Sequence, residues 1–324
     1  MEKPTTGPSL LMDARDGRIL YAEDIDNQWF PASLTKIMTA YVTFEAIKEG
    51  KLTMEARIPA SEHANAQPPS KVGLPVGATM PVDLALRAVI VKSANDVSVM
   101  LAEAISGSEA AFVARMNATA KRLGMTRTNF QNANGLPHPD QVTTARDLAK
   151  LSRAVLRDYP EHMGYWSMPD VRIGRRKLRT HNRLLQTYDG ADGLKTGFIC
   201  DSGYNVVATA SRDGRKLVAV VLGQMSGGER NIRTAALLEH GFDTGLLYRA
   251  VSRDTIDTAA MAPDAKTAQS IRRAVLSPEC GNRRRRKPAP VSKRPKSKAQ
   301  QISAAKAQSQ KKPQAAQAAP AKKQ

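Results

Sequence analysis

The 324-residue chain is long enough for one large domain or two small ones, and 41% hydrophobic residues suffice for a globular core. The formal charge of +19 is uneven, because residues 283–324 hold fourteen Lys or Arg and no acidic residue, which leaves about +5 for the rest. The charge of the body therefore does not by itself indicate a nucleic-acid-binding or membrane-binding domain.

Two stretches predict β-hairpins with an Asp-Gly turn, residues 9–24 and residues 204–224. The apolar spacing between and after them predicts helices, which we place at 33–48, 81–92, 95–105, 109–122, 144–157 and 229–247. Strands at both ends of a helical region are typical of an α+β fold. We expect one antiparallel sheet, formed by the N- and C-terminal hairpins, with the helical region inserted between them.

The domain organisation follows from composition. We predict a domain at 5–250, an irregular or weakly helical connector at 251–282, and a disordered polybasic tail of Lys, Pro, Ala and Gln at 283–324. The tail could make weak contact with an anionic surface, or be a solvated linker. The sequence has no run of eighteen apolar residues and no visible signal peptide. We therefore expect a soluble protein that is either cytoplasmic or has its leader removed or outside this sequence.

The two cysteines, Cys200 and Cys280, are far apart in sequence and lie on opposite sides of the predicted domain edge. Their spacing matches no disulfide framework and no zinc site. We interpret Cys200 as an incidental small residue, with an effect on access to the neighbouring motif as the alternative. Cysteine usage does not fix the cellular compartment.

The stretch "FPASLTKIMTAY" places Ser33 and Lys36 one helical turn apart, so a base could lie beside a nucleophile. An N-capped helix with a surface lysine fits the same residues. The spacing recurs at Ser303/Lys306 and Ser309/Lys312 in the tail, so the pair proves little alone. The five histidines, in contrast, follow no triad or HExxH pattern, and we expect them to be structural or on the surface: His63, His138, His162, His181 and His240.

Two further motifs follow in the chain. In "VKSANDVSVM", Ser93 and Asn95 lie at the junction of two apolar helices, where an isolated S-x-N is commonly a helix cap. In "ADGLKTGFICDSGYNVV", Lys195-Thr196-Gly197 lies in strand-like sequence and could be an edge-strand lysine before a turn. An S-x-x-K at a helix start, an S-x-N between helices and a K-T-G on a strand, in this order, together indicate serine acyl-transfer chemistry.

The chain resembles the low-molecular-weight penicillin-binding proteins, the serine-type D-alanyl-D-alanine carboxypeptidases of peptidase family S11. The resemblance runs from about Ser9 to Phe242 and includes "ASLTKIMTAYV", "GMTRTNFQNANGLP", "HNRLL", "DGLKTGF", "RDGRKLVAVVLG" and "LLEHGF". It implies a β-lactamase/transpeptidase-like fold, a periplasmic or cell-surface location, and a peptidoglycan stem peptide ending in D-Ala-D-Ala as substrate. It also implies covalent inhibition by β-lactams, no metal, no organic cofactor and no specific nucleic acid.

The resemblance assigns roles to the first two motifs. Ser33 is expected to be the nucleophile that forms the acyl-enzyme, and Lys36 the general base. A helix N-terminus and Lys195 are expected to disfavour the ammonium form of Lys36. Ser93 is expected to relay a proton, and Asn95 to orient Lys36 and the substrate amide.

The third motif is expected to bind substrate. Lys195 and Thr196 would recognise the terminal carboxylate, and Gly197 would let substrate approach the strand closely. The backbone N–H groups of Ser33 and Phe198 would form the oxyanion hole. Arg230 resembles a family arginine that assists with the carboxylate.

Three alternatives stay open on sequence. A D,D-endopeptidase that cuts peptidoglycan cross-links would use the same residues. A β-lactamase would need a glutamate-positioned water, but no E-x-x-L-N-like segment lies between the second and third motifs. A non-catalytic basic protein that binds wall polymer or nucleic acid would not need the three motifs. The sequence also lacks the β-rich module and amphipathic anchoring helix with which larger relatives continue, so membrane attachment is not predicted.

Overall fold

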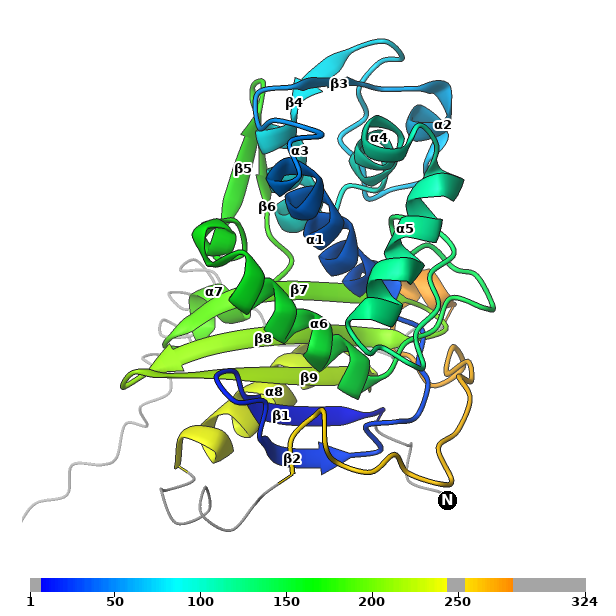
Figure 1. Cartoon of the computed structure of the whole chain (residues 1–324). Coiled ribbons are helices and arrows are strands. Elements are labelled where there is room, and N and C mark those ends of the chain that lie inside the picture. The colour runs from blue at the N-terminus through cyan, green and yellow to red at the C-terminus, as the bar shows by residue number, and fades with distance from the viewer. Residues whose placement is uncertain (1–6, 244–253, 282–324) are drawn as a thin grey trace, which may run out of the picture. The chain divides into compact units, whose positions relative to one another are not determined.

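The computed structural model describes residues 7–243 and 254–281 (Figure 1). Its central antiparallel sheet has the strand order β2-β1-β9-β8-β7. The strands are β1 (Ser9–Asp13), β2 (Ile19–Glu23), β7 (Ala191–Ile199), β8 (Gly203–Arg212) and β9 (Arg215–Gln224). The two predicted hairpins are therefore joined through β1 and β9, with Leu11 opposite Ala219. The predicted α+β architecture is confirmed.

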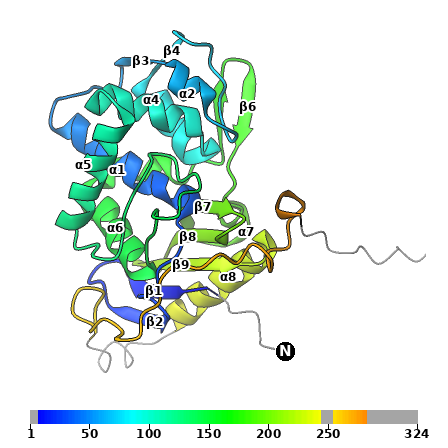
Figure 2. The same cartoon turned by 90° about the vertical axis from the view of Figure 1, so that its right-hand side faces the viewer.

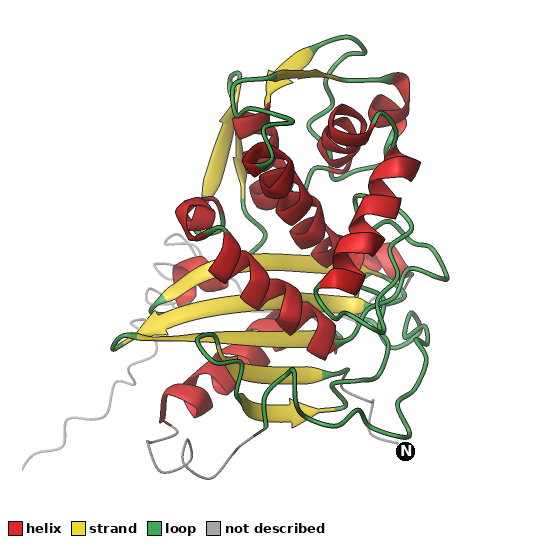
Figure 3. Cartoon of the chain, viewed as in Figure 1, coloured by secondary structure: helices red, strands yellow, loops and turns green. Residues whose placement is uncertain are grey.

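Helices cover both faces of this sheet (Figure 3). α6 (Ala145–Asp158) and the start of α1 (Thr35–Lys48) lie on one face and α8 (Gly227–Asp243) on the other, while α3 (Val82–Arg87), α4 (Asn95–Ser106) and α5 (Glu109–Arg122) surround α1 in the helical region. The predicted helix at 81–92 divides into α3 and a π-helical turn, η2 (Ala88–Lys92). The last four residues of the predicted helix 229–247 lie outside the described residues, as does the predicted tail at 283–324.

The main hydrophobic core lies between the sheet and the helical region, with α1 at its centre. Every residue of α1 from Thr35 to Phe44 is buried. A helix that is buried on all sides is stable only when other elements surround it. The opposite face of the sheet is covered by α8, whose Leu237 and Leu238 pack against alternate residues of β8 and β9. Because both faces are covered, the sequences of β8 and β9 are nearly continuous apolar runs without polar alternation.

Several short elements were not predicted from the sequence. They are two small antiparallel sheets, β3 (Arg57–Pro59) with β4 (Thr79–Pro81) and β5 (Asp170–Ile173) with β6 (Arg176–Arg179), and the short helices α2 (Glu62–Ala66) and α7 (Leu184–Thr187). Their strands have three or four residues and are partly charged, so they lack a readable apolar alternation. In Figures 1 and 2 the β5–β6 hairpin stands up from the β7 edge of the sheet beside the helical region.

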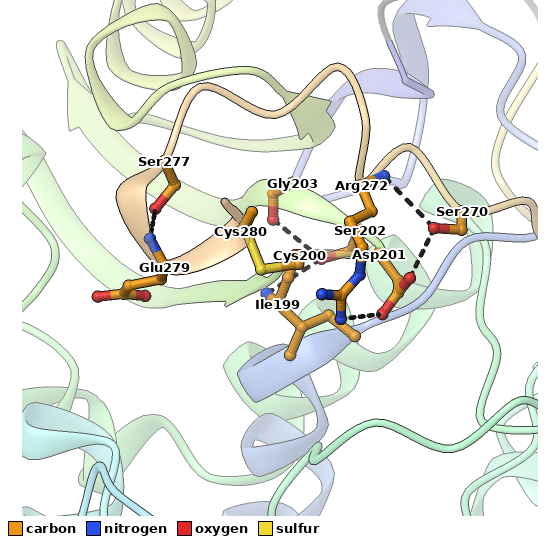
Figure 4. The surroundings of a disulfide bond; sticks show 10 residues. All are labelled: Ile199, Cys200, Asp201, Ser202, Gly203, Ser270, Arg272, Ser277, Glu279 and Cys280. Carbon is orange, nitrogen blue, oxygen red and sulfur yellow. Dashed lines mark hydrogen bonds and ion pairs between the residues drawn. A yellow bond between two sulfur atoms is a disulfide. The ribbon is translucent and has the colours of Figure 1, made fainter. Parts of the chain in front are cut away.

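The interpretation of Cys200 as an incidental small residue is wrong, because Cys200 and Cys280 form a disulfide with a Cα–Cα distance of 5.4 Å (Figure 4). The partners are 80 residues apart in sequence, a separation that no local spacing pattern can reveal. They meet because residues 254–281, here named the C-terminal strap, run back along the sheet to the turn between β7 and β8. Cys200 is therefore structural rather than incidental.

Polar contacts hold the strap along its length. At its start, Ile256 N donates to Gly17 O at 2.9 Å. The buried Arg146 guanidinium pairs with Asp26 and donates to the Ala259 carbonyl. Near the disulfide, Ser270 Oγ donates to Asp201 Oδ1 at 2.6 Å, and Arg272 pairs with the same carboxylate (Figure 4). The disulfide therefore closes a segment that is already fixed at several points.

Among the residues that the structure describes, no single helix is long and apolar enough to cross a membrane. Helices α4 and α5, which are bent by 83° relative to each other, together have the length and apolar composition of a membrane span, although neither has them alone.

We expect Cys280→Ser to lower the free energy of unfolding by about 2–4 kcal/mol, because the disulfide removes chain entropy from the unfolded state. Urea unfolding would measure the loss. Cys200→Ser and the double variant should show the same loss, since each breaks the same bond. If reductant leaves the unfolding of the wild-type chain unchanged, the disulfide does not stabilise the fold.

Candidate active site

Ser33 lies in a short 3-10 turn, η1 (Ala32–Leu34), immediately before α1. The turn has no side-chain cap, so Ser33 is not the N-cap that a simple helix start would use. Ala32 has a φ of 50°, a left-handed conformation that costs free energy for a residue with a side chain. The backbone just before Ser33 is thus held in a conformation that the surrounding structure must enforce.

Neighbouring segments enforce this turn from two sides. Asn205 on β8 donates from Nδ2 to the Phe30 carbonyl at 3.0 Å and to the Pro31 carbonyl at 3.3 Å. Gly197 on β7 lies so close that an added Cβ would be 2.9 Å from Pro31 O and 3.2 Å from Ser33 N. Gly135 is closer still, since a Cβ there would lie 1.9 Å from Ala32 O. The sheet and the loop around Gly135 therefore fix the position of Ser33.

Lys36 is fully buried and connects the first two motifs. Its Nζ lies 3.1 Å from Ser33 Oγ and 2.7 Å from Asn95 Oδ1, and it also donates to the backbone carbonyl of Asn134. The spacing of three residues predicted the contact with Ser33, and the structure brings Asn95 to the same amine. A buried amine with three oxygen partners has a fixed position, which is what a base beside a nucleophile requires.

Burial is the main reason that the pKa of Lys36 lies well below its ordinary value, and the positive charge of Lys195 adds to this effect. The carboxylate of Asp96 acts in the opposite direction. The sequence had indicated Lys195 and a helix N-terminus as the causes, and burial proves to be the largest. A neutral amine at Lys36 can accept a proton from the Ser33 hydroxyl.

Ser93 and Asn95 lie where η2 ends and α4 begins. Ser93 has a φ of 62° and a ψ of 40°, the left-handed conformation, and ends a π-helical turn, a feature that often occurs at functional sites. Its Oγ is buried and has no hydrogen-bond partner among the described residues. A buried hydroxyl without a partner is costly, so this hydroxyl is available to a bound molecule.

Asn95 is oriented by the loop that precedes β4. Its Nδ2 donates to Pro68 O at 2.9 Å, and its backbone N–H donates to Ser70 O at 2.7 Å. Because the amide nitrogen has a carbonyl partner, the amide oxygen faces Lys36. Asp96, next in the chain, accepts from the N–H groups of Val72 and Gly73 and closes the same loop onto α4.

The K-T-G motif lies in the middle of β7, with Lys195 and Thr196 buried. Burial, followed by the charge of Arg230, lowers the pKa of Lys195 to about 7. Arg230 is itself buried on α8, so its charge is poorly screened. The structure thus brings Arg230 within electrostatic reach of the third motif.

Sequence reasoning missed three contributors to the site, namely Asn134, Gly135 and Asn205. The first two belong to the "NANGLP" block, where an Asn-Gly pair could have signalled a turn with positive φ, and Gly135 has a φ of 85°. Asn205 gave no signal, because a single asparagine in a strand has no pattern. Near the end of β7, the Phe198 ring packs at a tilt against the Tyr204 ring, with centroids 4.3 Å apart.

This fold matches solved structures of penicillin-binding proteins. The chain superimposes on penicillin binding protein 5 from Haemophilus influenzae with a TM-score of 0.71 and 36% identity, over 75% of this chain and 72% of that one. Penicillin-Binding Protein D2 from Listeria monocytogenes, solved in an ampicillin-bound form, gives a TM-score of 0.65 and 31% identity over 74% and 100% of the two chains. The fold and the three motifs define a protein of the penicillin-binding class.

A family model described as D-alanyl-D-alanine carboxypeptidase, peptidase S11, matches residues 3–226. The chain belongs to this family. Among curated relatives, it is 35% identical to the D-alanyl-D-alanine carboxypeptidase DacC of Escherichia coli over 240 residues, 72% of this chain and 60% of that protein. It is 37% identical to DacA of Haemophilus influenzae, over 72% and 61% of the two chains. The chain thus spans about 60% of the length of these two relatives.

We expect the Lys195 amine to titrate near pH 7, as its lowered pKa of about 7 requires. Arg230→Gln removes a positive charge and should therefore raise this pKa towards the ordinary lysine value of about 10.4. NMR titration of 13C-labelled lysine side chains would measure both values, with the exposed Lys121 as the internal control. A Lys195 signal that titrates above pH 9 in the wild-type chain would contradict the site electrostatics.

Gly197→Ala should displace the Ser33 turn, because the new Cβ would meet Pro31 O at 2.9 Å. We expect a destabilisation of about 1–3 kcal/mol and a loss of Ser33 reactivity that exceeds any loss of folded protein. Gly164→Ala is the matched control, since nothing lies within 4 Å of a Cβ there. Equal reactivity of the two variants towards an acylating agent would show that Gly197 does not position Ser33.

Proposed function

We propose that the chain is a serine D-alanyl-D-alanine carboxypeptidase that removes the terminal D-Ala from peptidoglycan pentapeptides. The observation that carries the proposal is the buried Lys36 amine, which lies 3.1 Å from Ser33 Oγ and 2.7 Å from Asn95 Oδ1. The lowered pKa of this amine supports its role as a base. The names of the curated relatives point to the same reaction.

In the proposed reaction, Ser33 Oγ attacks the carbonyl carbon of the penultimate D-Ala and transfers its proton to Lys36 Nζ. The peptide bond breaks, and the leaving amine of the terminal D-Ala takes a proton that Ser93 relays. The ester on Ser33 is then hydrolysed by water, which regenerates the hydroxyl and releases the shortened peptide. The unpartnered Oγ of Ser93 supports the relay, since a bound peptide would supply its missing partner.

Substrate recognition is assigned to the β7 side. Lys195 and Thr196 bind the terminal carboxylate, and Arg230 adds positive charge behind them. A carboxylate that binds beside Lys195 favours the ammonium form and so raises its pKa. The N–H groups of Ser33 and Phe198 would stabilise the oxyanion, and Gly197 keeps the strand close to the Ser33 turn.

The proposal extends to location and domain organisation. The catalytic domain is assigned to residues 5–250, followed by a connector at 251–282 and a basic tail at 283–324. A substrate in the cell wall implies a periplasmic or cell-surface location. β-Lactams are expected to acylate Ser33 and inhibit the enzyme. The ampicillin-bound Listeria relative supports this expectation.

A D,D-endopeptidase is the closest alternative, because cleavage of a D-Ala cross-link would use the same residues. A non-catalytic basic protein is a more distant one. It would bind DNA or wall polymer through the tail, and that binding would survive Ser33→Ala and disappear on deletion of residues 283–324.

Incubation with benzylpenicillin, followed by intact-protein mass measurement, should give a stable adduct on the wild-type chain. Ser33→Ala should give none, since it lacks the nucleophile, and Ser9→Ala is the control for a buried serine outside the site. The wild-type chain should also release D-alanine from a pentapeptide that ends in D-Ala-D-Ala.

Three outcomes would change the assignment. No adduct and no D-alanine release would reject a penicillin-binding peptidase. An adduct that turns over within seconds would indicate a β-lactamase. Release from cross-linked dimers but not from pentapeptides would indicate the endopeptidase.

A further inference from the structure

The positive charge of the body is concentrated in one hairpin. Residues 1–282 contain 35 basic and 30 acidic residues, and the segment 170–183 contains six of the basic residues and one of the acidic ones. The rest of the body therefore holds 29 of each sign and is neutral. The six cations, all exposed, are Arg172, Arg175, Arg176, Lys177, Arg179 and Arg183. We name this segment, which contains β5, β6 and the residues up to α7, the basic hairpin.

The register of the hairpin separates an inner and an outer face. Val171 is opposite Leu178, and Val171 is buried. On the other face Arg172 is directly opposite Lys177. Like charges in directly opposed positions destabilise a strand pair, so the local fold gains nothing from this pair, whereas Arg179 on the same face is opposite Asp170. The arrangement is therefore better explained by an external anion than by stability.

Few of these charges are neutralised by the protein. Lys177 pairs with Asp170 at 2.9 Å, and Arg176 donates to the Val72 carbonyl at 2.8 Å. Across the described ranges, the remaining four arginines form no ion pair, although Arg179 is opposite Asp170 in the strand register. Their field is consequently available to a molecule in solution.

The basic hairpin adjoins the proposed active site. Its strands pack against η2, the turn that ends at Ser93. Arg176 bonds to the loop that orients Asn95, and Asn182 donates to the Gly193 carbonyl, two residues before Lys195. The pKa of His181 is lowered to about 4, mainly by desolvation and further by the positive charges of Lys195, Lys92 and Arg230. Positive charge thus extends from the K-T-G strand to the hairpin.

The chemistry of the hairpin favours one kind of partner. It exposes no large apolar side chain, which a membrane-surface anchor needs, and it has no Phe, Tyr or Trp on which nucleic-acid bases could stack. A carboxylate requires neither apolar nor aromatic side chains for binding, because arginine binds it through paired hydrogen bonds. A peptide with free carboxylates that enters the neighbouring site would reach these guanidinium groups.

We propose that the basic hairpin binds the internal carboxylates of the stem peptide, so that the site prefers anionic, polymer-bound stems over short or amidated ones. The inference rests on the proposed function, since it names the substrate class of the same site. The hairpin acts on binding and encounter, and takes no part in bond cleavage. Its contribution should therefore appear in kcat/KM and fall with salt.

The test uses Arg172→Gln/Arg175→Gln/Arg179→Gln, which spares the Arg176 and Lys177 contacts and relieves the opposed charges. A matched control is Arg15→Gln/Lys121→Gln/Lys266→Gln, which removes three exposed cations elsewhere in the described chain. D-alanine release is measured for two pentapeptides that differ only in whether the internal carboxylates are free or amidated, at low and high NaCl. Unchanged thermal unfolding would confirm that both variants are folded.

We expect the wild-type kcat/KM at low salt to be about tenfold higher for the free-carboxylate peptide, a modest value for electrostatic steering. The hairpin variant should lose most of this preference while its kcat/KM for the amidated peptide stays within about twofold, and high salt should reduce the wild-type preference similarly. An unchanged preference, or an equal loss on both peptides, would overturn the proposal.

Binding without turnover separates this inference from the proposed function. In a Ser33→Ala background, the hairpin variant should co-sediment less with insoluble peptidoglycan than the control variant. If no pentapeptide is cleaved by the wild-type chain, the proposed function fails, and co-sedimentation still decides whether the hairpin binds the polymer. Loss of binding to phosphatidylglycerol vesicles, with peptidoglycan binding intact, would assign the hairpin to a membrane and reject the proposal.

Discussion

The Lys36 amine is the point on which the site depends, because it is fully buried and yet holds three oxygen partners. Two of the partners come from elsewhere in the helical region, Asn95 at the start of α4 and the carbonyl of Asn134 in the loop between α5 and α6. A buried amine that lacked these partners would carry a large desolvation cost. The packing of the helical region therefore satisfies the buried Lys36 amine, and the same contacts place this amine, the proposed base, beside Ser33.

The sheet supplies the second constraint. Asn205 and Gly197, on neighbouring strands, hold the turn before α1 in place. Lys195 on β7 is close enough for its positive charge to lower the pKa of Lys36. Ser33, the proposed nucleophile, thus lies at the contact between the sheet and the helical region. This placement explains the lowered pKa values of Lys36 and Lys195, because both amines are buried between the sheet and the helical region.

Much of this architecture can be predicted from the sequence. The Asp-Gly hairpins and the apolar periodicity indicated the sheet and the long helices, and S-x-x-K spacing indicated the contact between Ser33 and Lys36. The carbonyl of Asn134 and the strand amide of Asn205 could not be found, since their contacts join segments without a local signature. The Cys200–Cys280 disulfide was missed for the same reason. Short charged strands such as β5 and β6 lack the alternation that marks a half-buried strand.

The pairing of β1 with β9 has a consequence for biosynthesis. β1 pairs with β2 directly after it in the chain, but its other neighbour is β9, where Ser9 is paired with Val221, so the β1–β2 hairpin can join the rest of the sheet only when most of the chain has been made. Contacts of such long sequence separation form slowly and cannot be completed on a partly synthesised chain. The five-stranded sheet can therefore be completed only late in synthesis, which is the condition that a chain needs if it is threaded across a membrane before it folds.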